Sequence, residues 1–344
     1  MAFLSDYDYD LPESMIASAP MEPRDECKML VYDRKTTQTN ITKFKDILSQ
    51  LHAGDVVVIN ETRVIPARLM GQKTTGAKIE ILLLKKITLT DYEVLVKPMR
   101  RLKIGDIVDV AGKLKCKLLS KDLTAGTAMM QLTCADGNQN LEAVIDTVGE
   151  IPLPHYIQNG KATKENYNTV YAKVDGSAAA PTAGLHWTDE LIQKAREKGV
   201  IFAPVVLDVG LGTFRPVKVD DISQHVMHQE RYQISATTAK IINDALRDGR
   251  RIIATGTTSL RTLEGCFAKH GEIKAVTDVT DIFIYPPYRF NVVSALITNF
   301  HLPKSTLLML VASLIGREKV LELYEFAKQN NFRFYSFGDC MFLQ

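Results

Sequence analysis

The pattern of hydrophobic and polar positions changes twice along the chain. Near the start, residues 28–33 predict a strand, residues 42–54 a helix and residues 55–60 a buried strand. From about residue 70 to 150, short apolar or alternating runs follow one another with no long helix between them, and the last run, residues 141–146, has the pattern of a further strand. Regularly spaced short strands predict a small antiparallel barrel or sandwich.

Alternation of strands and helices returns after residue 150. The predicted helices cover residues 188–199, 235–249, 258–271, 304–315 and 317–331. The predicted strands cover residues 200–210, 250–256, 280–288 and 332–337. We therefore expect an α/β protein with a mixed α/β main domain, discontinuous over residues 1–69 and 151–344, and an inserted small antiparallel β-barrel domain at residues 70–150.

The composition is that of a globular protein: 344 residues, 46% hydrophobic and 24% charged, with a formal net charge of +2. A dedicated non-specific nucleic-acid binder would be far more basic, so any polyanion site must be a local patch. The most apolar window, residues 305–316, spans about 12 residues, whereas a bilayer helix needs about 20. No signal-peptide pattern opens the chain, so we expect a cytoplasmic protein with no membrane partner.

The cysteines give no sign of a metal site or a disulfide framework. Their number is odd, and no pair has CxxC spacing; they are Cys27, Cys116, Cys134, Cys266 and Cys340. We expect five reduced thiols, as in a cytosolic protein, and no bound metal.

Two stretches combine a strand end with groups that bind anions. In "VVVINETRVIPARL", a buried strand is followed by Asn60, Arg63 and Arg68, and arginine suits bidentate capture of a carboxylate or phosphate. The alternative is a set of ordinary surface arginines. In "IIATGTTSLRTLE", a strand leads into a helix start that aims backbone N–H groups at an anion. Its candidate ligands are Thr257, Thr258, Ser259 and Arg261, and the alternative is an ordinary helix cap.

Three further stretches carry candidate binding or acid–base groups. "LDVGLGTFRPV" lacks the GxGxxG fingerprint, but its glycines let backbone approach a flat ligand. Its candidates are Gly210, Gly212, Thr213, Phe214 and Arg215. "HVMHQERY" holds His225 and His228, too few ligands for zinc, so acid–base work or a phosphate contact is favoured. "NFHLPKST" brings His301 and Lys304 to a helix start as basic contacts, or forms a plain helix start.

The stretch "GSAAAPTAGLHWT" is almost bare of side chains and then ends in His186 and Trp187, the only tryptophan. Small residues would let large flat ligands approach the main chain, with the two rings closing on them. The alternative is a tightly packed turn over a core tryptophan.

Together these stretches resemble one family, the S-adenosylmethionine:tRNA ribosyltransferase-isomerases of queuosine biosynthesis. Eleven segments carry the resemblance in order: 9–25, 56–69, 76–84, 94–106, 149–157, 167–188, 209–217, 225–234, 256–264, 295–311 and 332–339. The chain departs from the family pattern in having Asp208 where histidine is usual and Trp187 where phenylalanine is usual. Asp208 puts in doubt any essential role for a histidine at that position.

The resemblance implies an enzyme that uses S-adenosylmethionine as a co-substrate, with no metal. It implies transfer and isomerisation of the ribosyl group onto 7-aminomethyl-7-deazaguanine at the wobble position of tRNA. The products would be epoxyqueuosine in tRNA, adenine and methionine, and the protein would be a monomer. The alternatives are an S-adenosylmethionine-dependent RNA methyltransferase and a non-catalytic tRNA-binding protein, which adenine release would exclude.

The implied chemistry assigns roles to the candidates. A base must take a proton from the ribose carbon next to the sulfonium: His186 is the first candidate, followed by His228 and His225. The same histidines or Tyr171 would protonate departing adenine. Arg63, or Arg261 with the turn before it, would hold the methionine carboxylate, and Trp187 or Phe214 would stack on a base. On the inserted domain, Arg100, Arg101 and Lys103 are candidate contacts for tRNA phosphates, and the alternative is an ordinary solvated run of charges.

Overall fold

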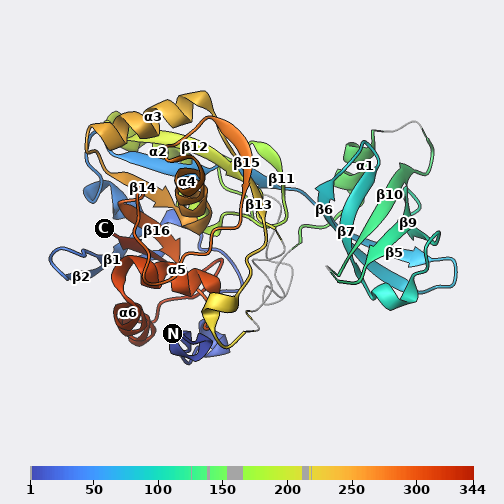
Figure 1. Ribbon diagram of the computed structural model, residues 1–344, viewed down its shortest axis with the longest axis horizontal. Helices are drawn as coiled ribbons and strands as arrows, with labels where there is room; N and C mark the ends of the chain where they lie inside the picture. Colours follow the sequence, from blue (N-terminus) through green and yellow to red (C-terminus); the bar gives the residue numbers. More distant parts are fainter. Residues whose placement is uncertain (1, 125, 138–139, 153–165, 211–216, 218) are drawn as a thin grey trace. The chain divides into compact units, whose positions relative to one another are not determined.

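The computed structural model describes residues 2–124, 126–137, 140–152, 166–210, 217 and 219–344. Contacts divide the chain into two compact units. The first comprises Met1–Arg63, His155–Val174 and Ala180–Gln344, and the second comprises Val64–Pro154 and Asp175–Ala179. Each is described by itself (Figure 1). The expected domain boundaries, between residues 69 and 70 and between residues 150 and 151, both fall a few residues inside the second unit.

The first unit is built on a nine-stranded sheet with the order β15-β13-β12-β3-β14-β16-β17-β1-β2. The strands are β1 Lys28–Tyr32, β2 Thr39–Lys43, β3 Val56–Asn60, β12 Ile201–Leu207, β13 Glu230–Ile234, β14 Ile252–Thr255, β15 Val276–Thr280, β16 Ala295–Asn299 and β17 Cys340–Leu343. The central strands β12, β3, β14 and β16 are mutually parallel. Strands β3, β14 and β16 are buried along their whole length, as expected where both faces of a parallel sheet are covered.

Helices cover this sheet (Figure 1). They are α2 Asp189–Glu197, α3 Ala236–Arg247, α4 Gly256–His270, α5 Thr306–Ile315 and α6 Arg317–Gln329. Short 3-10 helices accompany them: η1 Leu4–Tyr7, η2 Glu13–Met15, η3 Arg24–Glu26, η4 Phe44–Ser49, η6 Thr182–His186 and η8 Ile222–Gln224. Thr188 and Ser235 cap α2 and α3 through their side chains, so the predicted helix starts are confirmed.

The second unit is a closed barrel of six antiparallel strands in the order β10-β7-β6-β5-β8-β9. The strands are β5 Arg68–Lys73, β6 Lys78–Lys86, β7 Asp91–Lys97, β8 Ile107–Val110, β9 Leu114–Asp122 and β10 Thr127–Cys134, with the 3-10 helix η5 Met99–Arg101. Alternate residues of the strands fill its own apolar core. A two-stranded sheet pairs β4 Thr62–Val64 with β11 Val174–Ser177. The expected fold class, a mixed α/β protein with an inserted antiparallel barrel, is confirmed.

Two predicted elements near the barrel and the start of the chain are wrong. Residues 141–146 form part of the helix α1 Leu141–Val148, because Asn140 accepts hydrogen bonds from the first turn and the apolar residues recur at helical spacing against the barrel core. Residues 42–54 contain the end of β2 and the 3-10 helix η4, whose buried Phe44 and Ile47 have a three-residue spacing.

Two predicted strands near the end of the chain are also wrong. β15 ends at Thr280, and the consecutive Pro286 and Pro287 that follow cannot donate ladder hydrogen bonds. Residues 332–337 make only a single bridge at Phe334, because their aromatic rings pack with Phe300 and Tyr324. The strand that completes the sheet here is β17.

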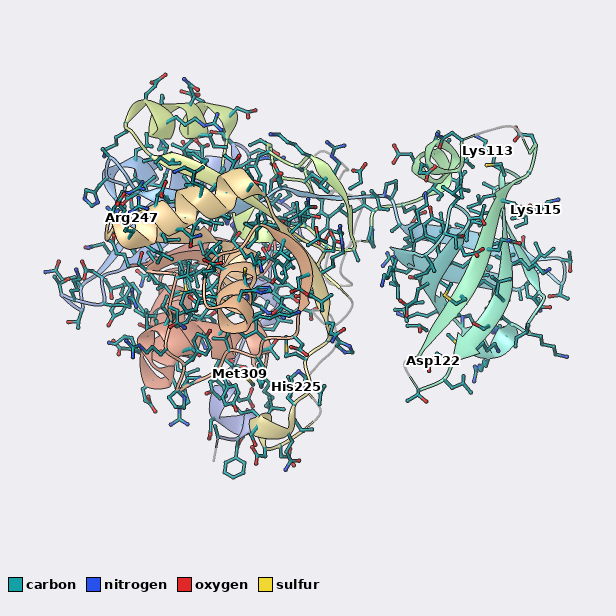
Figure 2. The ribbon with its side chains drawn as sticks, turned by 45° about the horizontal axis from the view of Figure 1, so that its top comes forward. Lys113, Lys115, Asp122, His225, Arg247 and Met309 are labelled. Carbon is teal, nitrogen blue, oxygen red and sulfur yellow. The ribbon has the colours of Figure 1, made fainter. Side chains whose placement is uncertain are left out.

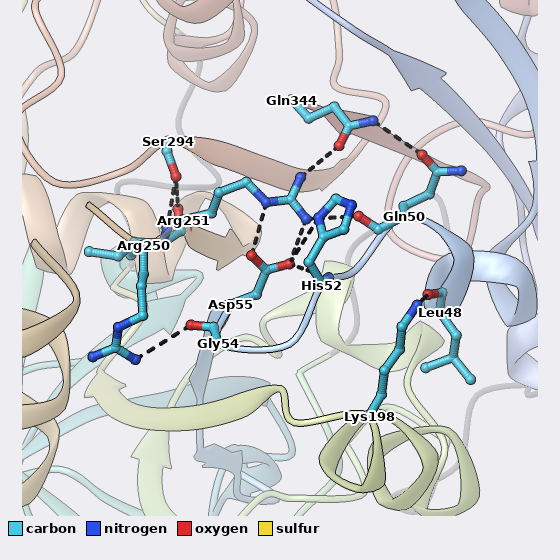
Figure 3. Close-up of polar contacts among 11 residues, drawn as sticks. Leu48, Gln50, His52, Gly54, Asp55, Lys198, Arg250, Arg251, Ser294 and Gln344 are labelled. Atoms are coloured by element: carbon cyan, nitrogen blue, oxygen red, sulfur yellow. Dashed lines mark hydrogen bonds and ion pairs between the residues drawn. The ribbon is translucent and has the colours of Figure 1, made fainter. Parts of the chain in front are cut away.

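A partly buried ion pair joins the amino ends of the central strands (Figure 3). Asp55, just before β3, accepts hydrogen bonds from Nε and Nη2 of Arg251 at 2.9 and 2.5 Å. The same guanidinium donates to Gln344 Oε1 at 2.9 Å. The polar side chains at this end of the sheet therefore bond to one another and stabilise the fold. No described helix is long and apolar enough to span a membrane.

Candidate functional site

The carboxyl ends of three parallel strands bring the predicted motifs to one edge of the sheet. Val58 of β3 pairs with Ala254 of β14, and Thr255 of β14 pairs with Ile297 of β16. The strand ends at Asn60, Thr255 and Asn299 therefore lie at the same level. Open α/β sheets bind ligands at this edge, so the candidate site is built here.

His186 lies at the end of η6 and is held in a defined tautomer. Its Nε2 is 2.9 Å from Oδ1 of Asn299. The Asn299 amide is oriented by its Nδ2, which donates to the carbonyl oxygens of Tyr335 and Ser336 at 3.0 and 3.1 Å. Because Oδ1 can only accept, Nε2 of His186 carries a proton and Nδ1 faces its other neighbour. That neighbour is Sγ of Cys27, at 3.1 Å.

Cys27 and His186 line one small pocket. The other lining residues are Pro20, Met21, Arg24, Asn166, Leu185, Ser336, Phe337 and Gly338. A hydrogen bond from Cys340 and the adjacent His186 ring lower the pKa of Cys27 in spite of its burial. Burial by itself would lower the pKa of His186, but the adjacent Cys27 thiolate outweighs it, and that pKa lies above its usual value. This pair could not be predicted from the sequence, since the two residues are far apart in the chain.

Cys340, at the start of β17, completes a buried cluster. The ligand atoms of Cys27, His186 and Cys340 all lie within 4.8 Å of one another. Two thiols and an imidazole are suitable ligands for a soft or borderline metal ion.

Two other residues approach η6 closely. Gly184 allows the hydroxyl of Tyr171 to lie against the backbone, because a Cβ at this position would be 2.0 Å from that oxygen. The hydroxyl is buried without a partner among the described residues, and burial raises the pKa of Tyr171 well above its usual value. At the other end of η6, Ala183 lies beside Gly256, the first residue of α4.

Polar groups at the start of α4 are buried without a hydrogen-bond partner in the described residues. Gly256 has a φ of 84°, and no side chain caps the helix. The Oγ1 atoms of Thr255 and Thr258 are buried with no partner in the described part of the chain. Ser259 donates to the carbonyl oxygen of Thr255 at 2.8 Å and Thr257 is buried, so the turn is a fixed set of donors at a helix N-terminus.

Arg261 lies one turn further along α4 and is buried. Its Nη1 pairs with Oε2 of Glu230, and Oε1 of the same carboxylate accepts a hydrogen bond from the backbone N–H of Gly210 at 3.4 Å. Its Nη2 is buried without a partner among the described residues. A buried guanidinium with one nitrogen that lacks a hydrogen-bond acceptor is suited to binding a carboxylate or phosphate ligand.

Trp187 is not available as a stacking platform in this structure. The side chain is 0% exposed, and its ring meets Phe44 and Phe202 edge-on with centroids 5.2 and 5.3 Å away. This is the arrangement of the alternative hypothesis, a core tryptophan beneath small residues. Phe214 lies outside the described residues, with Gly212, Thr213 and Arg215.

The predicted anion ligands after β3 have structural partners. Asn60 is fully buried and bonds to both the N–H and the carbonyl of Leu207, each at 3.1 Å. Arg63 donates to the carbonyl oxygen of Ala172 at 3.0 Å. Arg68 belongs to the barrel, where its Nε lies 3.2 Å from Glu80. Of the two arginines predicted for the carboxylate, Arg261 is the one with a buried nitrogen that has no partner among the described residues.

The remaining histidines differ in exposure. His301 is buried, its Nε2 is 2.8 Å from Thr298 Oγ1, and burial lowers its pKa to about 3. A neutral imidazole is therefore favoured at His301, and its role as a substrate contact stays a prediction. His225 is half-buried against Phe283, and His228 is exposed.

The other charged candidates are paired. Lys304 forms an exposed ion pair with Asp8 at 2.7 Å. Asp208, where the family usually has histidine, lies 3.1 Å from Arg231, and burial raises the pKa of its carboxyl group.

Comparison with known proteins agrees with the resemblance seen in the sequence. A family model described as "Queuosine biosynthesis protein" matches residues 4–343. Proteins named S-adenosylmethionine:tRNA ribosyltransferase-isomerase are 47% identical in Desulforamulus reducens and 49% identical in Clostridium kluyveri, each over 99% of both chains. The crystal structure of an S-adenosylmethionine tRNA ribosyltransferase from Thermotoga maritima is 36% identical with a TM-score of 0.57, covering 98% of this chain and 100% of that one. This chain therefore belongs to the family of queuosine biosynthesis proteins.

Proposed function

We propose that this protein is an S-adenosylmethionine:tRNA ribosyltransferase-isomerase. It transfers and isomerises the ribosyl moiety of S-adenosylmethionine onto the 7-aminomethyl-7-deazaguanine base at the wobble position of tRNA. Epoxyqueuosine in tRNA, adenine and methionine are the products. The observation that carries the proposal is the match, over 99% of both chains, to relatives that bear this name. We further propose that the protein works as a cytoplasmic monomer.

The spacing of the site supports this substrate. His186 lies at one end of η6, and the other end lies beside the start of α4. Ala183, the residue of η6 beside Gly256, is three residues before His186, which is about 6 Å along the helix at roughly 2 Å per residue. The methionine carboxylate and the ribose carbon bonded to the sulfonium are separated by roughly 6 Å at standard bond lengths. One extended S-adenosylmethionine molecule can therefore reach both groups.

Each end of the site has a role in the proposed mechanism. At the α4 end, Arg261 Nη2 and the Thr255 and Thr258 hydroxyls bind the methionine carboxylate. At the other end, His186 and Cys27 share one proton. When that proton is on the Cys27 thiol, Nδ1 of His186 is the base that takes the proton from the ribose carbon next to the sulfonium, with Asn299 keeping the other proton on Nε2. Tyr171, also beside η6, is placed to donate a hydrogen bond to departing adenine. The reaction requires no metal, because the sulfonium itself acidifies the carbon.

Adenine release tests the proposal against its alternatives. The protein is incubated with S-adenosylmethionine and tRNA that carries the aminomethyl-deazaguanine, and the products are separated by chromatography and mass spectrometry. We expect one adenine for each base converted to epoxyqueuosine. Methylated RNA with S-adenosylhomocysteine would indicate a methyltransferase instead. Tight tRNA binding with neither product would indicate a binding protein.

The role of His186 is tested by replacement with alanine. We expect His186→Ala to lower kcat at least 100-fold, because a positioned acid or base typically contributes about 10²–10⁴. His52→Ala is the matched control: this histidine is exposed at the opposite edge of the sheet, 3.9 Å from Asp55 (Figure 3), and should keep kcat within about two-fold. Near-normal turnover in His186→Ala, with an unchanged thermal midpoint, would remove His186 from the mechanism.

A further inference from the structure

The buried cluster of Cys27, His186 and Cys340 has the donor set of a metal site. We propose that these three residues bind a thiophilic divalent cation such as Zn²⁺. The sequence predicts no metal site, because no cysteine pair has the spacing of a known metal-binding motif. The fold nevertheless brings residues 27, 186 and 340 together in space. The three ligand atoms come from the residue before β1, the end of η6 and the first residue of β17.

The spacing of the donors fits a tetrahedral ion. Zinc takes sulfur ligands at about 2.3 Å and imidazole nitrogen at about 2.0 Å, so its ligand atoms stand roughly 3.5 Å apart. Cys27 Sγ and His186 Nδ1 are 3.1 Å apart, and all three donors lie within 4.8 Å of one another. Movements of side chains alone can therefore place an ion between them. Two thiolates would neutralise its charge in this buried position.

The tautomer of His186 is the one that a metal ligand requires. Asn299 Oδ1 holds the proton on Nε2, so the lone pair of Nδ1 is directed at the sulfur atoms. Histidine ligands in proteins characteristically donate their other ring N–H to such an oxygen, which fixes the ring. Asn299 is itself held by two backbone carbonyls, so the orientation of the imidazole does not depend on the ion.

The two cysteines are also held by backbone structure. β1 and β17 are neighbouring parallel strands, with Met29 opposite Cys340. The buried carboxylate of Asp339 joins them, accepting hydrogen bonds from the backbone N–H groups of Lys28 and Arg333 at 3.0 and 2.7 Å. A site whose ligands are positioned before binding loses little conformational entropy when the ion enters.

The pocket lined by Cys27 and His186 provides a route of entry and a fourth position. Arg24 and Ser336 line the same pocket. Three protein ligands and one open position are typical of zinc sites that accept water or another small ligand.

Binding would also control the reaction, a consequence that rests on the proposed function. The ion and the ribose proton compete for the same lone pair of His186 Nδ1. Zinc would therefore inhibit ribosyl transfer by occupying the base.

Cobalt provides a direct test of the site. Co²⁺ is titrated into the reduced full-length protein, and thiolate-to-cobalt charge transfer and the visible bands of a tetrahedral ion are recorded. We expect saturation at one ion per chain, displacement by one equivalent of Zn²⁺, and loss of the bands in Cys27→Ser and Cys340→Ala. Cys266→Ala is the control, since Cys266 is a buried thiol of α4 outside the cluster, and should retain the bands.

The outcomes separate the metal site from the catalytic proposal. Absence of charge-transfer bands in the wild type, or their survival in Cys340→Ala, overturns the site. Thermal unfolding of each variant, measured with a chelator present so that no metal is bound, identifies a variant that fails to fold. If a variant fails to fold, the cobalt titration of the wild type alone decides whether the site exists. In the adenine assay, one equivalent of Zn²⁺ should slow the wild type at least ten-fold and Cys340→Ala less than two-fold, each relative to its own zinc-free rate. A protein that binds cobalt but never releases adenine would refute the proposed function and leave the site standing.

Discussion

The two terminal nitrogens of the Arg261 guanidinium group have different surroundings. Nη1 is committed to Glu230 in a buried ion pair, and that pair fixes the direction of the side chain. Nη2 is left without a partner among the described residues, although it is buried. An unmet buried donor of this kind is costly unless a ligand satisfies it. In the proposed mechanism, the methionine carboxylate would supply this missing hydrogen-bonding partner.

Replacing Arg261 by lysine separates these two roles. Arg261→Lys keeps the positive charge beside Glu230 but removes the second nitrogen, because an ammonium group lacks the planar fork. We expect the KM for S-adenosylmethionine to rise about ten-fold or more, since a charge-assisted hydrogen bond contributes about 1.5–3 kcal/mol, with kcat changed much less. Steady-state kinetics of adenine release measure both constants.

Arg231→Lys is the matched control. Arg231 also pairs with a carboxylate, that of Asp208, but its side chain is half exposed. Its replacement should leave the KM near the wild-type value. An unchanged KM in Arg261→Lys would show that the methionine carboxylate binds elsewhere.

At the scale of elements, the sequence predicted what is encoded locally. Side-chain caps such as Thr188 and Ser235 mark helix starts because the capping partner is three residues away. The segment 332–337 could not be assigned in this way, since its aromatic residues pack against Phe300 and Tyr324. The same reason hid the Cys27–His186–Cys340 cluster: its members meet only through strand order, whereas the motif at the start of α4 is contiguous in sequence.

The junction between β14 and α4 depends on one glycine. Gly256 has a φ of 84°, and a Cβ there would meet its nearest atoms, Thr258 Oγ1 and Ala183 Cβ, at 3.5 and 3.7 Å. There is room for a methyl group, so the cost of Gly256→Ala comes from the backbone, about 1–2 kcal/mol for a left-handed residue. Strain at this turn would redirect the N–H groups that we propose bind the methionine carboxylate. We expect a lower free energy of unfolding and at least a ten-fold loss of kcat/KM.

Gly271→Ala gives the comparison for that variant. Gly271 ends the same helix with a φ of 74° and has nothing within 4 Å of an added Cβ, so the backbone cost should be similar. Denaturant unfolding should therefore show that the free energy of unfolding falls by a similar amount in the two variants. The value of kcat/KM should be reduced only in Gly256→Ala. Equal loss of activity in both would mean that the turn acts through stability alone.

At the scale of the whole molecule, the near-neutral charge limits how tRNA can be bound. A formal net charge of +2 provides no general attraction for RNA, so binding must depend on local basic groups. The barrel carries two such groups with exposed side chains. One is Arg100, Arg101 and Lys103 near η5, and the other is Lys113, Lys115 and Lys117 at β9. Figure 2 labels Lys113 and Lys115 of the second group on the barrel.

Salt dependence of tRNA affinity distinguishes the two groups. Each phosphate neutralised by the protein contributes about 0.7–0.9 to the slope of log K against log salt concentration. Changing Arg100, Arg101 and Lys103 together to glutamate should therefore flatten the slope by roughly 2 to 3. The same change at Lys113, Lys115 and Lys117 alters the net charge equally and should leave the slope within about 0.5 of the wild type if only the first group touches phosphate. Filter binding over a range of salt concentrations measures all three slopes. A flatter slope in the second variant alone would show that the tRNA phosphates bind at β9. An equally flattened slope in both variants would mean that net charge, rather than a defined patch, sets the affinity.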